Sequence, residues 1–241
     1  MKQKVAVVTG AAGGIGLAVA LDLHGKGYHV LGVDRVASEN TSFADFFMHD
    51  ICDEESWSAL AGQVEREYGS LDALVNIAGR NYYSPIESSD LNEWRSMFDV
   101  NVLGMVTSIK HCGHLLRKTE NSSIVNMSSI SAHIGSHGYA AYCATKGAVD
   151  SLTKSLALEF APTVRVNAVA PGWIETNFTM EGLLLSEDPV EYRRQVEKMH
   201  ALERVGSPAE IAKTISWLLS ADASFVTGSV IVVDGGYLIK N

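Results

Sequence analysis

The chain has 241 residues, a formal net charge of −9 at pH 7 and 46% hydrophobic residues. That is enough apolar material for a full core, and α/β domains of this length are commonly single, so we expect one domain over residues 1–241. The acidic balance, without a block of lysines or arginines, argues against nucleic acid and anionic membrane surfaces as partners.

The amino-terminal segment carries basic residues, but its apolar run breaks at Thr9 and Gly10 and is too short for a secretory signal. Nothing in the sequence approaches the ~20 apolar residues that span a bilayer. The cysteines, Cys52, Cys112 and Cys143, show neither metal-ligand spacing nor a disulfide pattern. We therefore expect a cytoplasmic protein with no bound metal.

Short apolar runs, rich in valine and isoleucine, recur along the chain with helical stretches between them. Because polar and apolar residues hardly alternate within them, the runs are typical of parallel strands buried on both faces. They cover residues 5–10, 29–34, 72–79, 122–129, 164–172 and 229–236. Helices are predicted at 14–26, 54–68, 90–116, 142–160 and 207–221. Repeated β-α units predict an α/β fold: a single-domain, Rossmann-type, doubly wound parallel sheet flanked by helices on both faces.

Three glycines, Gly10, Gly14 and Gly16, follow the first strand and enter the first helix. Glycine there allows a tight turn and lets backbone N–H groups approach a pyrophosphate at the helix N-terminus, where the dipole favours negative charge. The glycine pattern alone is also compatible with a purely structural turn. The residues that follow favour a dinucleotide.

Asp34 ends the second strand, a little beyond the ~20-residue offset at which an acidic side chain meets the adenosine ribose. Its carboxylate can accept hydrogen bonds from both ribose hydroxyls and would repel a 2′-phosphate, which favours NAD over NADP. Arg35 keeps NADP open, because a guanidinium pairs bidentately with phosphate, although a solvated arginine is the simpler interpretation. Asp50 and Ile51, after the short third strand, either contact adenine or cap the next helix.

Two polar residues, Asn101 and Ser129, stand out before the long helix at 142–160. Asn101 puts an amide inside an otherwise apolar helix, where an unpaired polar group is costly. Ser129 lies at the carboxyl end of a predicted parallel strand, where ligands bind in open α/β sheets. A structural interpretation stays open for both: a helix-bending residue and a strand-end cap.

Tyr142 and Lys146 lie four residues apart and therefore share one face of that helix. Such a pair is most often a packing tyrosine beside a solvated lysine. A phenol with a pKa of about 10 needs a shift of roughly two to three units to act as a base at neutral pH. One ammonium ~4 Å away, at an effective dielectric of about 20, supplies about that much. We therefore predict that Lys146 lowers the pKa of Tyr142.

Taken together, these motifs resemble the short-chain dehydrogenase/reductase family, and the resemblance runs nearly from end to end. The motifs are TGAAGGIG, Asp34, NIAG, VNVLG, a serine thirteen residues before YCATK, APGWIET and VDGG. The resemblance implies that Tyr142 exchanges the alcohol proton and that Ser129 hydrogen-bonds the substrate oxygen. It also implies that Lys146 lowers the tyrosine pKa and binds the nicotinamide ribose, while Asn101 holds a water in a proton relay. Hydride then passes between the carbinol carbon and nicotinamide C4.

The resemblance also implies a set of cofactor contacts. The predicted cofactor-binding residues are Gly10, Gly14, Ile15, Gly16, Asp34, Arg35, Asp50, Ile51, Asn76, Ala78, Gly79, Tyr142, Lys146, Pro171, Gly172, Ile174 and Thr176. One departure is Ile77, where the family usually has a second asparagine. Because Asn76 is present, we expect the adenosine side of the site to be retained.

The segment at 174–205 is longer than most connections in a compact domain and is interpreted as a substrate-binding lid, the lid segment. It contains two helix-like pieces, EGLLL and PVEYRRQVEKMH. We predict that Tyr82, His137 and Trp173 contact the substrate together with Ser129. Their aromatic and imidazole groups indicate a small polar or cyclic alcohol. The short 34–50 connection is similar to that of the family branch that oxidises 2,3-dihydro-2,3-dihydroxybenzoate, which suggests a dihydrodiol.

The sequence therefore predicts an NAD-dependent oxidoreductase that interconverts a secondary alcohol and a ketone, with Tyr142 as general acid/base. By resemblance, we expect the chain to form a homotetramer or dimer. Two alternatives stay open: an NADP-dependent carbonyl or 3-oxoacyl reductase in which Arg35 binds the NADP phosphate, and a dinucleotide sensor without catalysis.

Overall fold

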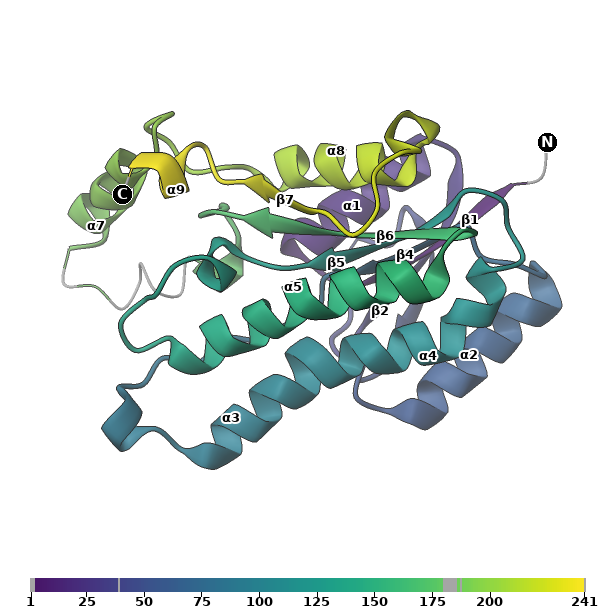
Figure 1. Cartoon of the computed structure of the whole chain (residues 1–241), viewed down its shortest axis with the longest axis horizontal. Coiled ribbons are helices and arrows are strands. Elements are labelled where there is room, and N and C mark those ends of the chain that lie inside the picture. Colours follow the sequence, from purple (N-terminus) through teal and green to yellow (C-terminus); the bar gives the residue numbers. More distant parts are fainter. Residues whose placement is uncertain (1–2, 39, 180–185, 187, 241) are drawn as a thin grey trace.

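A computed structural model describes residues 3–38, 40–179, 186 and 188–240 (Figure 1). In this part of the chain, seven parallel strands form one sheet in the order β3-β2-β1-β4-β5-β6-β7. The strands are β1 Lys4–Thr9, β2 Tyr28–Asp34, β3 Ala44–Met48, β4 Ala73–Asn76, β5 Ser122–Met127, β6 Val164–Pro171 and β7 Val230–Val233. Because the order runs outward from β1 in both directions, the predicted doubly wound sheet is confirmed.

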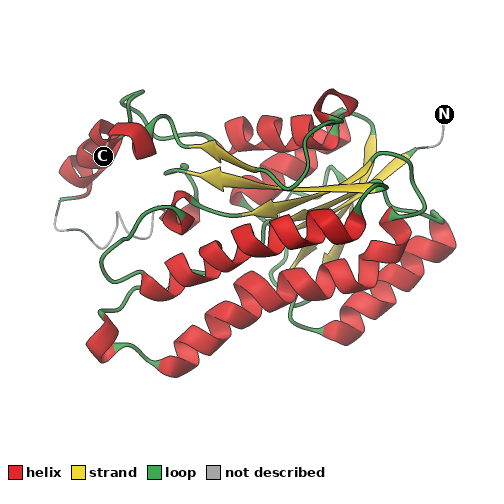
Figure 2. Ribbon diagram, in the orientation of Figure 1, coloured by secondary structure: helices red, strands yellow, loops and turns green. Residues whose placement is uncertain are grey.

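Helices connect the strands and cover both faces of the sheet (Figure 2). They are α1 Gly14–Gly25, α2 Glu54–Glu67, α3 Leu91–Phe98, α4 Gly104–Leu116, α5 Ala140–Phe160, α7 Pro189–Met199, α8 Pro208–Leu219 and α9 Tyr237–Lys240. α7 coincides with the second helix-like piece predicted in the lid segment, whereas EGLLL lies outside the described residues. None of the described helices is long and apolar enough to cross a bilayer.

Alternation along each strand sends neighbouring side chains into two separate cores. Val5 and Val7 face a core closed by α2, α4 and α5, whereas Ala6 and Val8 face a core closed by α1 and α8. Figure 1 shows the same division, with α1 and α8 on one side of the sheet and α2, α4 and α5 on the other. Burial on both faces explains why the strand sequences are continuously apolar.

The predicted helix at 90–116 is interrupted by a π-helical segment, Asp99–Leu103, that joins α3 to α4. A single uninterrupted helix was therefore the wrong prediction at this point. π-Helical segments place backbone groups out of the regular ladder and are frequent at functional sites. Asn101 lies in the middle of this one.

Candidate active site

The glycine loop after β1 forms a cradle that only glycine fits. Gly10 and Gly14 adopt φ values of 72° and 51°. A Cβ on Gly16 would lie 1.9 Å from the carbonyl oxygen of Gly10, which is backbone and cannot move aside. Helix α1 starts at Gly14 with no acidic residue in its first turn and, among the described residues, no side-chain cap at Gly13. The N–H groups at this helix start, Ile15 included, are therefore available to an anion.

Asp34 lies beside this cradle, at the carboxyl end of β2. Its Oδ2 accepts a hydrogen bond from the backbone N–H of Ala12 at 3.0 Å, and its Oδ1 accepts one from Val36 at 3.3 Å. The carboxylate is thus held next to the glycine loop, and its remaining lone pairs can accept from two hydroxyls. Arg35 is exposed beside it. Together, the glycine cradle and the held carboxylate fit a dinucleotide.

Asp50 and Ile51, which follow β3, form hydrogen bonds within the local structure. Asp50 accepts from the backbone N–H of Cys52 at 2.9 Å, and the Ile51 carbonyl accepts from the Trp57 indole at 2.8 Å. Both residues help to form the turn into α2, so adenine contacts from them stay a prediction.

Asn76 is only 3% exposed, and its side chain is already paired inside the sheet. Its amide donates to Asn126 at 3.0 Å, and its carbonyl oxygen accepts from Ser108 at 2.7 Å. A cofactor contact at this position would therefore come from the backbone. Ala78 and Gly79 pack against the site, since the Ala78 N–H donates to the Thr9 hydroxyl at 3.1 Å and a Cβ on Gly79 would approach Asn101.

The segment after β6 returns to the glycine loop from the other side. β6 ends at Pro171, and a Cβ on Gly172 would lie 2.9 Å from the Asp234 backbone. Ile174 is buried and forms an isolated bridge with Gly206. Thr176 lies over the loop itself, because its methyl would be 3.3 Å from a Cβ on Gly14. The four residues predicted here thus line the same end of the sheet as the glycine cradle.

Ser129, Tyr142 and Lys146 meet at the carboxyl end of β5. Ser129 begins the 3₁₀ turn Ile130–Ala132, where its hydroxyl accepts from the Ser131 N–H at 3.1 Å, and it is close enough to the Tyr142 phenol to lower its pKa. The Lys146 side chain is 3% exposed, donates to the Met127 carbonyl at 2.8 Å and lies 5.5 Å from the Tyr142 ring centroid. A hydroxyl, a phenol and an ammonium at one point can bind and protonate a carbonyl or alkoxide oxygen.

The pKa of Tyr142 is shifted in the direction opposite to the predicted one. Burial raises the pKa of Tyr142 to about 12, and the Ser129 hydroxyl opposes this rise. Burial also lowers the pKa of Lys146 to about 8, with Asp150 acting in the other direction. The prediction assumed an ammonium directed at the phenol oxygen, whereas the structure holds this ammonium on the Met127 carbonyl. Desolvation of the phenol therefore outweighs the lysine charge.

The Asn101 amide is fully engaged within the protein. Its oxygen accepts from the Arg80 N–H at 2.8 Å, and its nitrogen donates to the Arg80 carbonyl at 2.9 Å and to the Thr145 hydroxyl at 3.1 Å. With both amide protons used, the side chain fixes the loop after β4 against α5. A relay water at this position would therefore have to hydrogen-bond to backbone groups of the π-helical segment instead of the Asn101 side chain.

The three predicted substrate contacts are spread around this point. The Tyr82 hydroxyl accepts from the N–H of Asp90 at 3.3 Å, and His137 is exposed. The Trp173 ring packs against Tyr192 of α7, with the two centroids 6.2 Å apart. The sequence analysis missed Phe178, whose ring centroid lies 6.2 Å from that of Tyr142. No local signal marks Phe178, because its proximity to Tyr142 depends on the path of the chain after β6.

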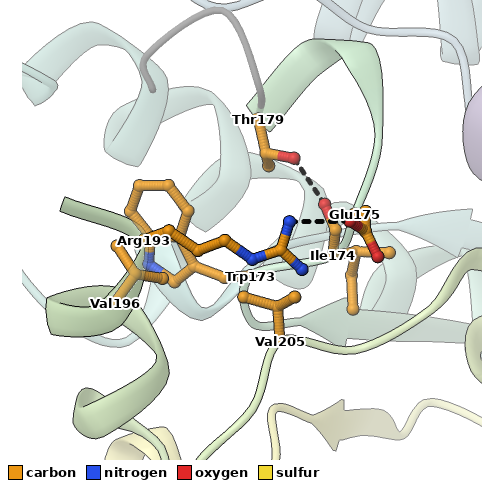
Figure 3. Close-up of a pocket in the computed structure, with 7 residues that line it drawn as sticks. All are labelled: Trp173, Ile174, Glu175, Thr179, Arg193, Val196 and Val205. Atoms are coloured by element: carbon orange, nitrogen blue, oxygen red, sulfur yellow. Dashed lines mark hydrogen bonds and ion pairs between the residues drawn. The ribbon is translucent and has the colours of Figure 1, made fainter. Parts of the chain in front are cut away.

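A small pocket lies between α7 and the segment after β6 (Figure 3). In Figure 3, the Arg193 guanidinium extends across it to Glu175, at 2.9 Å. Arg193 also pairs with Glu197 at 3.0 Å. The lining residues are Trp173, Ile174, Glu175, Thr179, Arg193, Val196 and Val205. Ser129, Tyr142 and Lys146 are not among the residues that line it.

Comparison with known proteins gives consistent matches along the chain. Residues 10–238 match the family described as Enoyl-(Acyl carrier protein) reductase. A cis-4-hydroxycyclohexanecarboxylate dehydrogenase of Sinomonas cyclohexanicum is 36% identical, covering 98% of this chain and 96% of that protein. An NADP-dependent (R)-specific alcohol dehydrogenase of Lentilactobacillus kefiri is 35% identical, with 98% and 97% covered. The ligand-free aldohexose dehydrogenase of Thermoplasma acidophilum has a TM-score of 0.95 at 35% identity, with 99% and 95% covered.

Proposed function

The chain belongs to the short-chain dehydrogenase/reductase family, a family of dehydrogenases acting on hydroxyl groups, and we propose that it uses NAD to interconvert a secondary alcohol and a ketone. One observation carries this proposal. Ser129, Tyr142 and Lys146 converge at the carboxyl ends of the strands, called the sheet edge below, where the glycine cradle and Asp34 also lie. A phenol and an ammonium next to a dinucleotide cradle provide the proton transfer that must accompany hydride transfer.

In the oxidative direction, the Tyr142 phenolate takes the hydroxyl proton of the alcohol, and Ser129 donates a hydrogen bond to the developing carbonyl oxygen. Bound NAD supplies the acceptor for the hydride that leaves the carbinol carbon. The Lys146 ammonium stabilises the phenolate. Since the pKa of Tyr142 is raised to about 12, the neutral phenol predominates at neutral pH. Ketone reduction, which needs a proton donor, is therefore favoured there.

We propose a compact cyclic alcohol as the substrate. Two aromatic pairs involve the segment after β6: Phe178 lies beside Tyr142, and Trp173 packs on Tyr192. Flat aromatic walls suit an alicyclic ring better than a long flexible chain. The relatives named for a hydroxycyclohexanecarboxylate and for an aldohexose support the same class. A dihydrodiol is one member of this class.

A substrate panel tests this function. Cyclohexanol, cyclopentanol, cyclic diols, aldohexoses and linear secondary alcohols are each incubated with NAD and with NADP, and reduced cofactor is followed by its absorbance. We expect NADH formation that is fastest with a cyclic alcohol. Turnover restricted to linear substrates would reject the cyclic class. Binding of NADH without turnover of any alcohol or ketone would favour the sensor alternative.

The NADP-dependent reductase is the second candidate, supported by Arg35 and by the NADP-dependent relative from Lentilactobacillus kefiri. Parallel fluorescence titrations with NADH and NADPH separate the two. Tighter binding of NADH is expected because the Asp34 carboxylate faces the ribose and repels a 2′-phosphate. Tighter binding of NADPH would reject this argument.

We also propose that the chain works in the cytoplasm as a homotetramer or dimer. The support is the free state of Cys52, Cys112 and Cys143 and the exposure of apolar side chains on α5 and β7, where Leu158 is 82% and Val232 41% exposed. Light scattering of the purified protein tests the assembly, and a monomeric mass would contradict it.

A further inference from the structure

A buried carboxylate, Asp150, lies one helical turn beyond Lys146 on α5. Asp150 is 8% exposed, and both of its oxygens have partners. The Ser128 hydroxyl donates to Oδ1 at 2.5 Å, and His133 Nε2 lies 3.6 Å from Oδ2. A carboxylate is rarely buried without such pairing, because desolvation of its charge is costly.

Tyr142, Lys146 and Asp150 share one face of α5, and their three partners are consecutive residues at the end of β5. Met127 accepts from the Lys146 ammonium through its carbonyl, Ser128 donates to Asp150, and Ser129 interacts with the Tyr142 phenol. On α5, the three positions are spaced i, i+4 and i+8, so they form one stripe along the helix. Each of the three stripe residues on α5 thus interacts with one of three successive residues at the end of β5. Asp150 is the stripe residue that the proposed mechanism does not use.

The carboxylate next to Lys146 on this stripe favours the protonated form of the lysine. Lys146 is buried, and burial alone disfavours an ammonium. The titratable groups that face it are Tyr142 and Asp150 on its own helix, and His133, which follows the 3₁₀ turn after β5, lies against Asp150. Of these, Asp150 is the one carboxylate. His133 is partly exposed and connects this buried carboxylate to the surface.

We propose that Asp150 is a positioning residue for the catalytic pair: its carboxylate, one helical turn beyond Lys146 on the same face of α5, keeps the Lys146 ammonium charged at the end of β5. This inference rests on the proposed function, because it concerns the residue that stabilises the Tyr142 phenolate. Asp150 acts through Lys146 and makes no contact with the reacting atoms.

The direct test is the titration of Lys146 in protein labelled with ¹³C at lysine Cε, followed by NMR. The Lys146 signal is the one lost in Lys146→Met. Asp150→Asn keeps the shape and an oxygen for Ser128 but removes the charge, and we expect the midpoint of Lys146 to fall by roughly one pH unit or more. Ser128→Ala is the matched control, since it loosens the same contact and keeps the carboxylate, and its midpoint should stay close to the wild-type one.

An unchanged Lys146 midpoint in Asp150→Asn would overturn the proposal, as would an equal fall in Ser128→Ala. Asp150→Ala is measured in parallel, so that poor folding of one variant does not remove the comparison. In the pH profile of turnover, Asp150→Asn should move the alkaline limb to lower pH by the same amount, whereas a merely structural loss lowers the rate at every pH. Because the NMR titration needs neither substrate nor cofactor, absence of turnover would reject the proposed function and leave the role of Asp150 separately measured.

Discussion

The sheet edge and the lid segment hold their polar groups in opposite ways. At the sheet edge, Lys146 and Asn101 are 3% and 1% exposed, and each is bonded to backbone groups of another element. In the lid segment, the Arg193 side chain is 40% exposed and pairs with two surface carboxylates. Buried pairs are costly to break, and exposed pairs contribute little. We therefore propose that the buried set carries out the reaction and that substrate choice lies with the lid segment, whose exposed contacts are easily changed.

The largest effect is expected at the sheet edge, from Tyr142→Phe. Loss of the phenol removes the proton acceptor and donor, so turnover should fall by roughly 10²–10⁴-fold. NADH affinity should change little, because the ring remains. Stopped assays of kcat together with fluorescence titration of NADH measure both quantities.

Tyr139→Phe is the matched control for this variant. Tyr139 precedes α5 and packs edge-on against Tyr83, with ring centroids 5.2 Å apart, so its hydroxyl is not expected to take part in the reaction. We expect it to retain most turnover. Comparable losses in the two variants would show that removal of either tyrosine hydroxyl acts through packing, and would contradict a catalytic role for the Tyr142 phenol.

Asp34→Ala should have the next largest effect, confined to the cofactor. Hydrogen bonds to a charged group contribute about 1.5–3 kcal/mol, so NADH affinity should fall roughly 10- to 100-fold. NADPH affinity should rise or stay constant, because the repulsion of its 2′-phosphate is removed. Asp45→Asn, a carboxylate on the neighbouring β3 that pairs with His29, serves as the control. Equal losses for both cofactors would contradict the assignment of Asp34 to the ribose.

Arg193→Gln should have a smaller effect, confined to the substrate. It breaks the ion pair that joins α7 to Glu175 (Figure 3) and the ion pair with Glu197 within α7. Exposed ion pairs contribute at most about 1 kcal/mol each, so we expect the KM for the alcohol to rise roughly two- to fivefold with kcat nearly unchanged. The neighbouring Arg194→Gln, whose partner Glu191 is 3.6 Å away on the same helix and also exposed, should leave KM unaltered. A drop in kcat instead would place the lid segment within the catalytic machinery.

The smallest effect concerns stability at the carboxyl end of the lid segment. Glu210 lies in the first turn of α8 and pairs with Arg204 at 2.7 Å, which lowers its pKa to about 2. A depressed carboxyl pKa stabilises the fold above the unfolded value of 4.5, and this contribution disappears as the pH falls through about 2. Glu210→Gln should therefore lower the free energy of unfolding by less than about 1 kcal/mol at neutral pH. Urea unfolding should show no difference in strong acid, and a constant difference would contradict the ion pair as its source.

Local patterns in the sequence were sufficient for the sheet, the glycine cradle and the spacing of the catalytic residues. Strand positions follow from apolar runs buried on both faces, and Tyr142 and Lys146 share a face because helical periodicity is local. Asp150 could have been found by the same reasoning, since it continues that face by one more turn. Its burial against Ser128 and His133, however, is not visible in the helical spacing.

The remaining features depend on contacts between distant segments. The π-helical segment forms where Asn101 binds Arg80 and Thr145, which are 21 and 44 residues away. The raised pKa of Tyr142 results from burial, which no local pattern reports. Likewise, Asn76 pairs with Asn126 across β4 and β5, so its side chain is committed within the sheet.

The most direct test of the proposed reaction follows the hydrogen on the carbinol carbon. The alcohol that reacts fastest in the panel is prepared with deuterium on that carbon and incubated with NAD, and the reduced cofactor is analysed by mass spectrometry. The proposed mechanism predicts that every NADH formed carries deuterium at nicotinamide C4, and that Tyr142→Phe forms almost none. Reduced cofactor without deuterium, or wild-type rates in Tyr142→Phe, would contradict it.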